Sequence, residues 1–121
     1  MSLNLTPRQV GDVTLVAATG RITLGEEVTL LRDQILKLVA SGQQKIVLNL
    51  AEVSYVDSSG MGELVSVYSA VRNQGGMLKL LSLTKRVKDL LRMTKLSTLF
   101  EVFEDESAAL SSFAETKASG G

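Results

Sequence analysis

Residue types that can do chemistry gather in one stretch, residues 57–62, which reads Asp-Ser-Ser-Gly-Met-Gly. An apolar run precedes it and an amphipathic run follows, so a carboxylate and two hydroxyls are predicted at a junction between a strand and a helix N-terminus. The first backbone N–H groups of a helix have no partner within the helix, and such a junction favours anions. We expect Asp57 to be the N-cap, and Gly60 and Gly62 to leave the backbone open to a second molecule. The same residues equally fit a capped helix start whose glycines only allow tight packing.

The rest of the sequence lacks most of the residues and motifs that enzymes commonly use. The chain has no histidine and no cysteine, which excludes Ser-His-Asp and Cys-His mechanisms, disulfides and the common zinc sites. Ser58 and Ser59 lack the glycine two residues earlier that a nucleophile elbow requires, and the glycine patterns of nucleotide-binding loops are absent. Glu52 and Glu63, near Asp57, are interpreted as surface charges rather than as a magnesium site. We therefore expect no enzyme, no metal and no cofactor.

Size and charge indicate one domain without a polyanionic partner. The chain has 121 residues, 45% of them hydrophobic, and its 13 basic and 13 acidic side chains give a net charge of zero. This length fits a single domain, and a neutral chain has no overall attraction for nucleic acid. The basic run at 85–95 is interpreted as a solvated face. Because no stretch of about 18 apolar residues exists and the N-terminus lacks a signal-peptide pattern, we expect a cytoplasmic protein without membrane contact.

The elements that must position residues 57–62 follow from hydrophobic periodicity. Strands are predicted at Leu3–Val10, Val13–Thr19, Lys45–Leu50, Val53–Val56, Met77–Leu83 and Phe100–Phe103. Helices are predicted at Gly25–Ser41, from Asp57 to Asn73, at Thr84–Leu96 and at Asp105–Phe113. This alternation predicts an α/β fold with helices packed on a mixed, partly parallel sheet, and Pro7 assigns the first strand to an edge.

The end of the chain and the aromatic residues complete this picture. Residues 1–114 are predicted to form the domain, and the small, polar tail 115–121 is predicted to be disordered. The aromatic residues fall at apolar positions and are all predicted to belong to the core: Tyr55, Tyr68, Phe100, Phe103 and Phe113.

Residues 57–62, with the apolar strand before them and a helix that ends at Gly75-Gly76, resemble the STAS domain of bacterial anti-sigma factor antagonists. The resemblance covers nearly the whole chain, since the Gly-Arg-Ile turn at 20–22, the strand at 45–50 and the segment at 75–80 match in order and spacing. It implies a single STAS-like domain with a mixed four- to five-stranded sheet and about four helices. The chain departs from the family at Thr23, where members often carry an acidic residue, and this bears on how a kinase or its nucleotide is engaged.

The resemblance also implies a function and its site. In this family a partner anti-sigma factor kinase phosphorylates the second serine of the Asp-Ser-Ser-Gly motif, which corresponds to Ser59. Asp57 matches the acid that phosphorylation needs, Ser58 the neighbouring hydroxyl that is not the usual acceptor, and Gly60 the motif glycine. The implied partners are an anti-sigma factor serine kinase and a serine phosphatase, and the expected oligomeric state is a monomer or weak dimer.

Phosphorylation at Ser59 is expected to act on a partner rather than on the fold. The phosphate adds about −1.5 to −2 charges, and a helix N-terminus favours it by roughly 0.3 to 1 kcal/mol. The rim of the partner contact is predicted at Thr23, Gly25, Met61 and Gly62, because the turn after the second strand should lie beside the first turn of the motif helix. A core position inside that helix is the alternative for Met61.

Two other function classes stay open. STAS domains also serve as scaffold subunits of stress-sensing assemblies or as accessory subunits of lipid-transport ATPases, and both can keep a hydroxyl at the matching position. The motif turn alone would also suit a module that binds an anion or a nucleotide phosphate.

Overall fold

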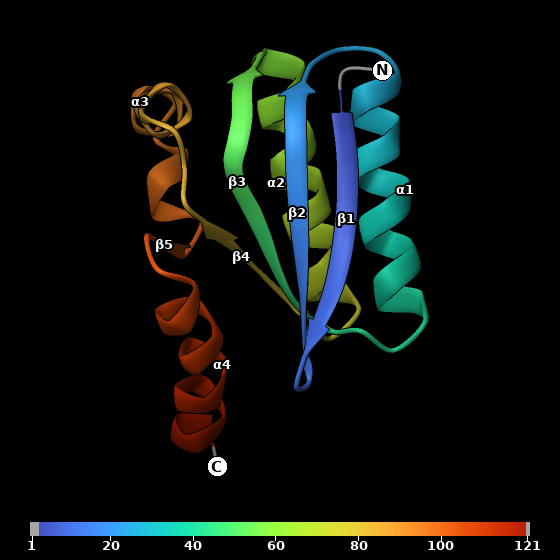
Figure 1. Cartoon of the computed structure of the whole chain (residues 1–121), viewed down its shortest axis with the longest axis vertical. Helices are drawn as coiled ribbons and strands as arrows, with labels where there is room; N and C mark the ends of the chain where they lie inside the picture. Colours follow the sequence, from blue (N-terminus) through green and yellow to red (C-terminus); the bar gives the residue numbers. More distant parts are fainter. Residues whose placement is uncertain (1–2, 121) are drawn as a thin grey trace.

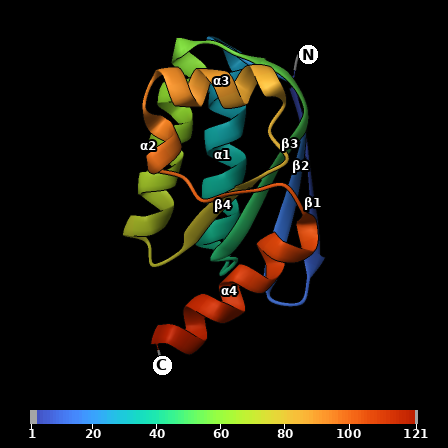
Figure 2. The ribbon, with the colours of Figure 1, turned by 90° about the vertical axis from the view of Figure 1, so that its left-hand side faces the viewer.

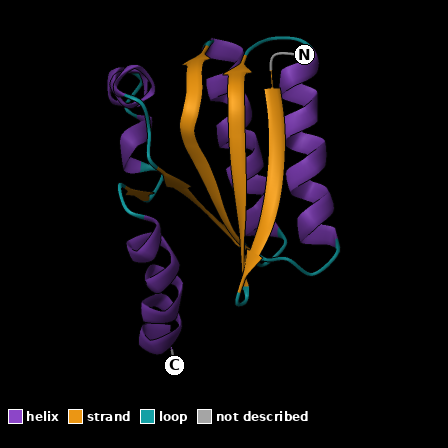
Figure 3. Cartoon of the chain, in the orientation of Figure 1, coloured by secondary structure: helices purple, strands orange, loops and turns teal. Residues whose placement is uncertain are grey.

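Five strands form one mixed sheet in the order β1-β2-β3-β4-β5 (Figures 1 and 3). The computed structural model describes the backbone of residues 3–120 and the side chains of residues 3–113. The strands are β1 (Leu3–Val10), β2 (Val13–Ile22), β3 (Lys45–Val56), β4 (Met77–Leu81) and β5 (Val102–Phe103). β1 is antiparallel to β2, and all later neighbours are parallel. The predicted mixed sheet is confirmed, and β1 with its proline is an edge strand, where the missing N–H costs no ladder bond.

Helices cover both faces of this sheet. They are α1 (Glu26–Ala40), α2 (Ser58–Asn73), α3 (Lys85–Met93), the short 3₁₀ helix η1 (Leu96–Thr98) and α4 (Glu106–Gly120). α1 and α2 pack side by side behind the strands, and α4 packs on the other face (Figures 1 and 2). The expected α/β domain with four helices is therefore confirmed. In the part of the chain that the structure describes, no helix has both the length and the apolar character needed to span a bilayer.

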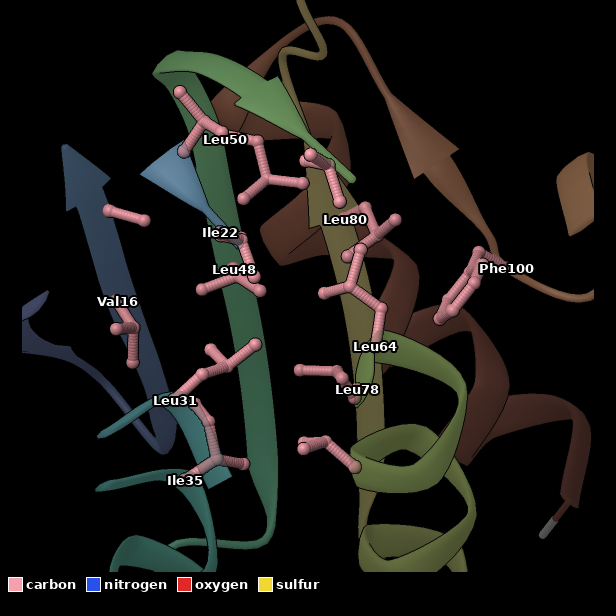
Figure 4. Packing of buried hydrophobic residues seen from close by; sticks show 14 of the residues in the cluster. Val16, Ile22, Leu31, Ile35, Leu48, Leu50, Leu64, Leu78, Leu80 and Phe100 are labelled. Carbon is pink, nitrogen blue, oxygen red and sulfur yellow. The ribbon is translucent and has the colours of Figure 1, made fainter. Parts of the chain in front are cut away.

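The main core lies between the sheet and the helices α1, α2 and α3. Apolar side chains at alternate positions of β2, β3 and β4 meet the inner stripes of the helices (Figure 4). Fully buried members include Ile22, Leu31, Ile35, Leu48, Leu64, Leu78 and Leu80. Burying each such side chain contributes about 1.5 to 3 kcal/mol, so this cluster fixes how the helix starts sit against the strand ends.

The opposite face carries a smaller core that contains a buried lysine. Val13, Leu15, Val47 and Leu81 pack under Ala109 and Phe113 of α4. The side chain of Lys79 is 1% exposed, and its Nζ lies 2.9 Å from a carboxylate oxygen of Glu101. It also donates to Ser112 Oγ at 2.8 Å and lies 4.3 Å from the centroid of the Phe113 ring. A buried charge needs such partners, and nothing in the apolar run at 77–83 predicts this lysine to be buried.

Several boundaries differ from the sequence predictions. The two strand segments predicted at 45–50 and 53–56 form one strand, β3. Its pairing with β2 shifts register twice, between Ala17 and Thr19 and between Gly20 and Arg21, and each shift accommodates one extra residue on β3. β5 covers only Val102 and Phe103, whereas Phe100 and Glu101, which follow η1, lie outside the strand. α4 begins after Asp105, whose carboxylate accepts from Ala108 N–H at 3.0 Å. Its backbone stays helical to Gly120, across most of the predicted tail 115–121, and residue 121 lies outside the described residues.

Where β3 meets α3, one sequence prediction is wrong and one is confirmed. Tyr55 is exposed rather than part of the core, and the Arg86 guanidinium carbon lies 5.2 Å from its ring centroid. The stacked guanidinium replaces the apolar cover that the pattern predicts. The basic run is a solvated face as predicted, since Lys85 and Arg92 both pair with Asp89.

Candidate functional site

Asp57 caps α2, as the sequence predicts. Its backbone is extended, and its Oδ1 accepts a hydrogen bond of 2.7 Å from the backbone N–H of Gly60. The Asp57 carbonyl accepts from Met61 N–H at 2.9 Å, which is the first bond of the helix ladder. A short acidic side chain at this position satisfies a backbone donor that the helix leaves free.

The same side chain joins the helix start to the loop between β2 and α1. Asp57 Oδ2 accepts from the backbone N–H of Leu24 at 2.9 Å, and the Asp57 N–H donates to the carbonyl of Ile22 at 3.2 Å. The prediction that the turn after β2 lies beside the first turn of α2 is therefore confirmed. The N–H groups of Leu24 and, next, Gly60 stabilise the ionised carboxylate and lower the pKa of Asp57 below its ordinary value.

The two motif glycines have different roles. A Cβ built on Gly60 would lie 2.1 Å from the Ile22 carbonyl oxygen and 2.8 Å from Val56 Cγ1. Gly60 is buried and lets the first turn of α2 approach the end of β2, so the expectation that it faces a second molecule is wrong. Gly62 is exposed and a Cβ there would meet nothing within 4 Å, so its backbone is open as predicted.

The two hydroxyl residues, although adjacent, lie on different sides of α2. Ser58 is exposed and lines an apolar groove of about 460 Å³ between α2 and α3, together with Met61, Gly62 and Val65. Ser59 is half-buried and does not line that groove. It precedes Glu63 by four residues and therefore shares the helix side that faces α1.

Glu63 is a buried carboxylate, not the surface charge that its position predicts. Its two oxygens accept from Arg32 of α1, with Nε to Oε2 at 2.8 Å and Nη2 to Oε1 at 2.9 Å. The Glu63 side chain is 6% exposed, whereas that of Arg32 is 52% exposed. No sequence signal marks this pair, because the partners are 31 positions apart and on separate helices.

The predicted rim residues fall into two groups. Thr23 is half-buried, and Gly25 and Gly62 are exposed. The φ angle of Gly25 is 122°, a backbone conformation that favours glycine directly before α1. Met61 is buried and belongs to the main core, so the alternative role is the one that the structure shows. Sequence reasoning missed Leu24, whose side chain is 76% exposed on the loop that Asp57 holds.

A metal centre finds no support in the described part of the chain. No group of three acidic side chains there lies close enough to hold an ion. Glu52 is exposed, and the carboxylate of Glu63 is occupied by Arg32.

Comparisons with known proteins place this geometry in a family. Residues 4–109 match the STAS domain family. The chain is 30% identical over 102 residues to the anti-sigma-B factor antagonist of Bacillus subtilis, a match that covers 84% of this chain and 92% of that relative.

Solved structures share the fold. The anti-sigma factor antagonist of Mycobacterium paratuberculosis has a TM-score of 0.80 at 20% identity, covering 92% of this chain and 93% of its own. The Bacillus cell fate determinant SpoIIAA, solved in its phosphorylated form, has a TM-score of 0.69 at 18% identity, covering 91% of this chain and 99% of its own. At these identities the two structures show a common architecture.

Proposed function

The chain belongs to the STAS domain family, among the anti-sigma factor antagonists, and from this premise we propose that it is a phosphorylation-switched binding protein. Unphosphorylated, it binds an anti-sigma factor that is also a serine kinase, and thereby frees a sigma factor. Phosphorylation of Ser59 by that kinase releases the complex, and a serine phosphatase restores binding. Anti-sigma factor antagonists are regulators rather than enzymes, so the activity to be measured is binding.

One observation carries this proposal: the carboxylate of Asp57 binds the loop at Leu24 and the first turn of α2 at the same time. The loop that it holds carries the exposed apolar side chain of Leu24 at the end of the sheet where α2 begins, with Ser59 in the first turn of that helix. A flat partner surface that covers both would bury Leu24 and leave no room for a phosphate. Thr23, Gly25 and Gly62 form the proposed rim of this contact.

The size of the expected effect follows from charge and space. An acidic partner group about 4 Å from the phosphate is repelled by roughly 4 kcal/mol per unit charge at an effective dielectric constant near 20. Solvent screening reduces this value, yet a loss of about 2.7 kcal/mol already weakens binding about 100-fold. The phosphorylated form of SpoIIAA supports the idea that this fold tolerates the modification.

The test compares the affinities of Ser59→Ala and Ser59→Asp for the cognate anti-sigma factor by calorimetry. We expect Ser59→Ala to bind within about threefold of the wild type and Ser59→Asp to bind about 100-fold more weakly. Ser69→Asp is the matched control, because Ser69 is exposed on the same helix nearly three turns further on. Equal affinities of the two Ser59 variants would refute the charge mechanism.

A second measurement addresses the modification itself. The protein incubated with the kinase and ATP should gain the mass of one phosphate, and peptide sequencing should place it on Ser59. Phosphate on Ser58 instead would contradict the assigned acceptor while leaving the binding proposal in place.

A further inference from the structure

The contact between α1 and α2 contains an arginine with unused donors. Arg32 reaches Glu63 through Nε and Nη2, in a two-pronged arrangement at 2.8 and 2.9 Å. A guanidinium carries five N–H donors in a rigid fork, so the Nη1 group is left over. Among the described residues no other hydrogen bond or ion pair of Arg32 occurs, and its side chain is half open to solvent.

Helix geometry places the Ser59 side chain on the side of α2 that carries this pair. Side chains four residues apart on a helix have Cβ atoms about 5 to 6 Å apart, and long side chains lean toward the helix N-terminus. By this rule we expect Glu63, and the guanidinium bound to it, to lie on the Ser59 side of their turn. Ser58 is excluded from this arrangement, because it lines the groove on the α3 side.

We propose that Arg32 holds the phosphate on Ser59, donating to the phosphate and to Glu63 at once. Charge-assisted hydrogen bonds from arginine to phosphate are strong and directional. Without Arg32, a dianionic phosphate would stand one turn from a buried carboxylate, and like charges at this spacing destabilise a helix. Arg32 is thus a positioning residue for the phosphorylated state. The inference rests on the proposed function only in taking Ser59 as the modified residue.

The charged groups near the phosphate should change its second pKa, and this pKa is the quantity to measure. Asp57 caps α2 and Glu63 lies on the same helix, and both disfavour its dianionic form. Glu26 and Glu27, in the first turn of α1, instead line the hollow beside Leu3 of β1. Arg32 is the cation that opposes Asp57 and Glu63, so its removal should raise the second pKa of the phosphoserine. A purely structural role of the ion pair would leave that pKa unchanged.

The experiment installs phosphoserine at position 59 of the full chain during synthesis and titrates it by ³¹P NMR. The informative comparison is Glu63→Gln against Arg32→Gln/Glu63→Gln, because the double variant leaves no unpaired buried carboxylate. We expect the double variant to titrate about half a pH unit higher than Glu63→Gln. Arg8→Gln is the matched control, since Arg8 also pairs with a carboxylate, Glu106, on a distant surface, and it should leave the midpoint unchanged.

If the phosphoserine titration midpoints of Glu63→Gln and of the double variant agree within about 0.1 pH unit, the proposal is overturned. If the double variant does not fold, the Nε–H resonance of Arg32 in the wild type decides the question: a shift on phosphorylation supports the contact, and an unchanged resonance refutes it. Because the phosphate is installed chemically, both results are independent of any kinase. A failure here is therefore distinct from a failure of the binding test at Ser59.

Discussion

Asp57 illustrates how one residue serves both the fold and the proposed switch. Its two carboxylate oxygens accept from backbone N–H groups in separate segments, Leu24 and Gly60. The side chain therefore aligns the β2–α1 loop with the start of α2, and through them the surface around Ser59. These two hydrogen bonds give the acid at position 57 a structural role in the site, alongside the role in phosphorylation that the family resemblance implies.

Replacing Asp57 by alanine should lower the free energy of unfolding by about 1 to 2 kcal/mol at pH 7, because a helix cap and a loop contact are lost. The pKa of Asp57 is lowered from 3.8 in the folded protein. Its stabilisation is therefore present above that value and is lost as pH falls through the lower folded-state pKa. Urea unfolding at pH 7 and pH 3 should show the gap between variant and wild type narrowing at low pH. A gap of equal size at both pH values would contradict this account, and Asp33→Ala on the exposed side of α1 is the control.

The two motif glycines give opposite predictions for the same substitution. Gly60→Ala must displace the Ile22 carbonyl, so we expect a loss of about 1 to 3 kcal/mol in the free energy of unfolding. Gly62→Ala meets open space within a helix, so we expect a gain of about 0.5 to 1 kcal/mol. Chemical denaturation of both variants checks the pair. If both substitutions change the free energy of unfolding in the same direction, the close approach of the Ile22 carbonyl is not the reason why position 60 is a glycine.

At the scale of elements, the loop between β2 and α1 is the part of the site that the motif itself does not reveal. It carries Leu24, an exposed apolar side chain that contributes nothing to the core. Its position is fixed by backbone hydrogen bonds to Asp57 rather than by packing. We therefore regard Leu24 as the apolar anchor of the proposed contact.

Leu24→Ser should weaken binding to the anti-sigma factor about 10-fold while leaving the unfolding midpoint unchanged, because the side chain is buried only in the complex. Affinity and stability are measured on the same sample. Met93→Ser is the matched control, since Met93 is 77% exposed, close to the 76% of Leu24, but lies at the end of α3. Unaltered affinity of Leu24→Ser would remove this loop from the interface.

At the scale of the whole molecule, the site and the buried lysine lie on different parts of the sheet. The arrowheads of β2 and β3 point to the end where α1 and α2 begin, and α4 runs toward the other end (Figure 1). Lys79 lies under α4, among the residues that close the second face. Changes at Lys79 should therefore affect stability and spare partner binding.

Lys79→Ala should cost about 2 to 4 kcal/mol of stability, because it leaves a cavity against Phe113. Lys79→Met should stay within about 1 kcal/mol of the wild type, since an apolar side chain of similar length can replace a buried ion pair. Thermal and urea unfolding of the two variants check the difference. If the methionine variant loses as much as the alanine variant, the charge rather than the volume holds α4 in place.

The sequence by itself determined those features of the protein that depend only on residues close together in the chain. Alternation and helical periodicity predict the order of the elements, Pro7 predicts the edge strand, and the Asp-Ser-Ser-Gly stretch predicts a capped helix start. These predictions are confirmed because each depends on residues a few positions apart, whose physics is the same in any fold.

Only the tertiary structure decided which groups meet across the chain. Leu24 and Asp57 are 33 positions apart, as are Lys79 and Ser112. Arg32 and Glu63 lie on separate helices. The reason why position 60 has no room for a side chain is the carbonyl of Ile22, which lies on β2. Neither the burial of a charge nor the space beside a glycine is encoded in a local pattern, because both depend on surfaces that exist only after the sheet and helices have packed.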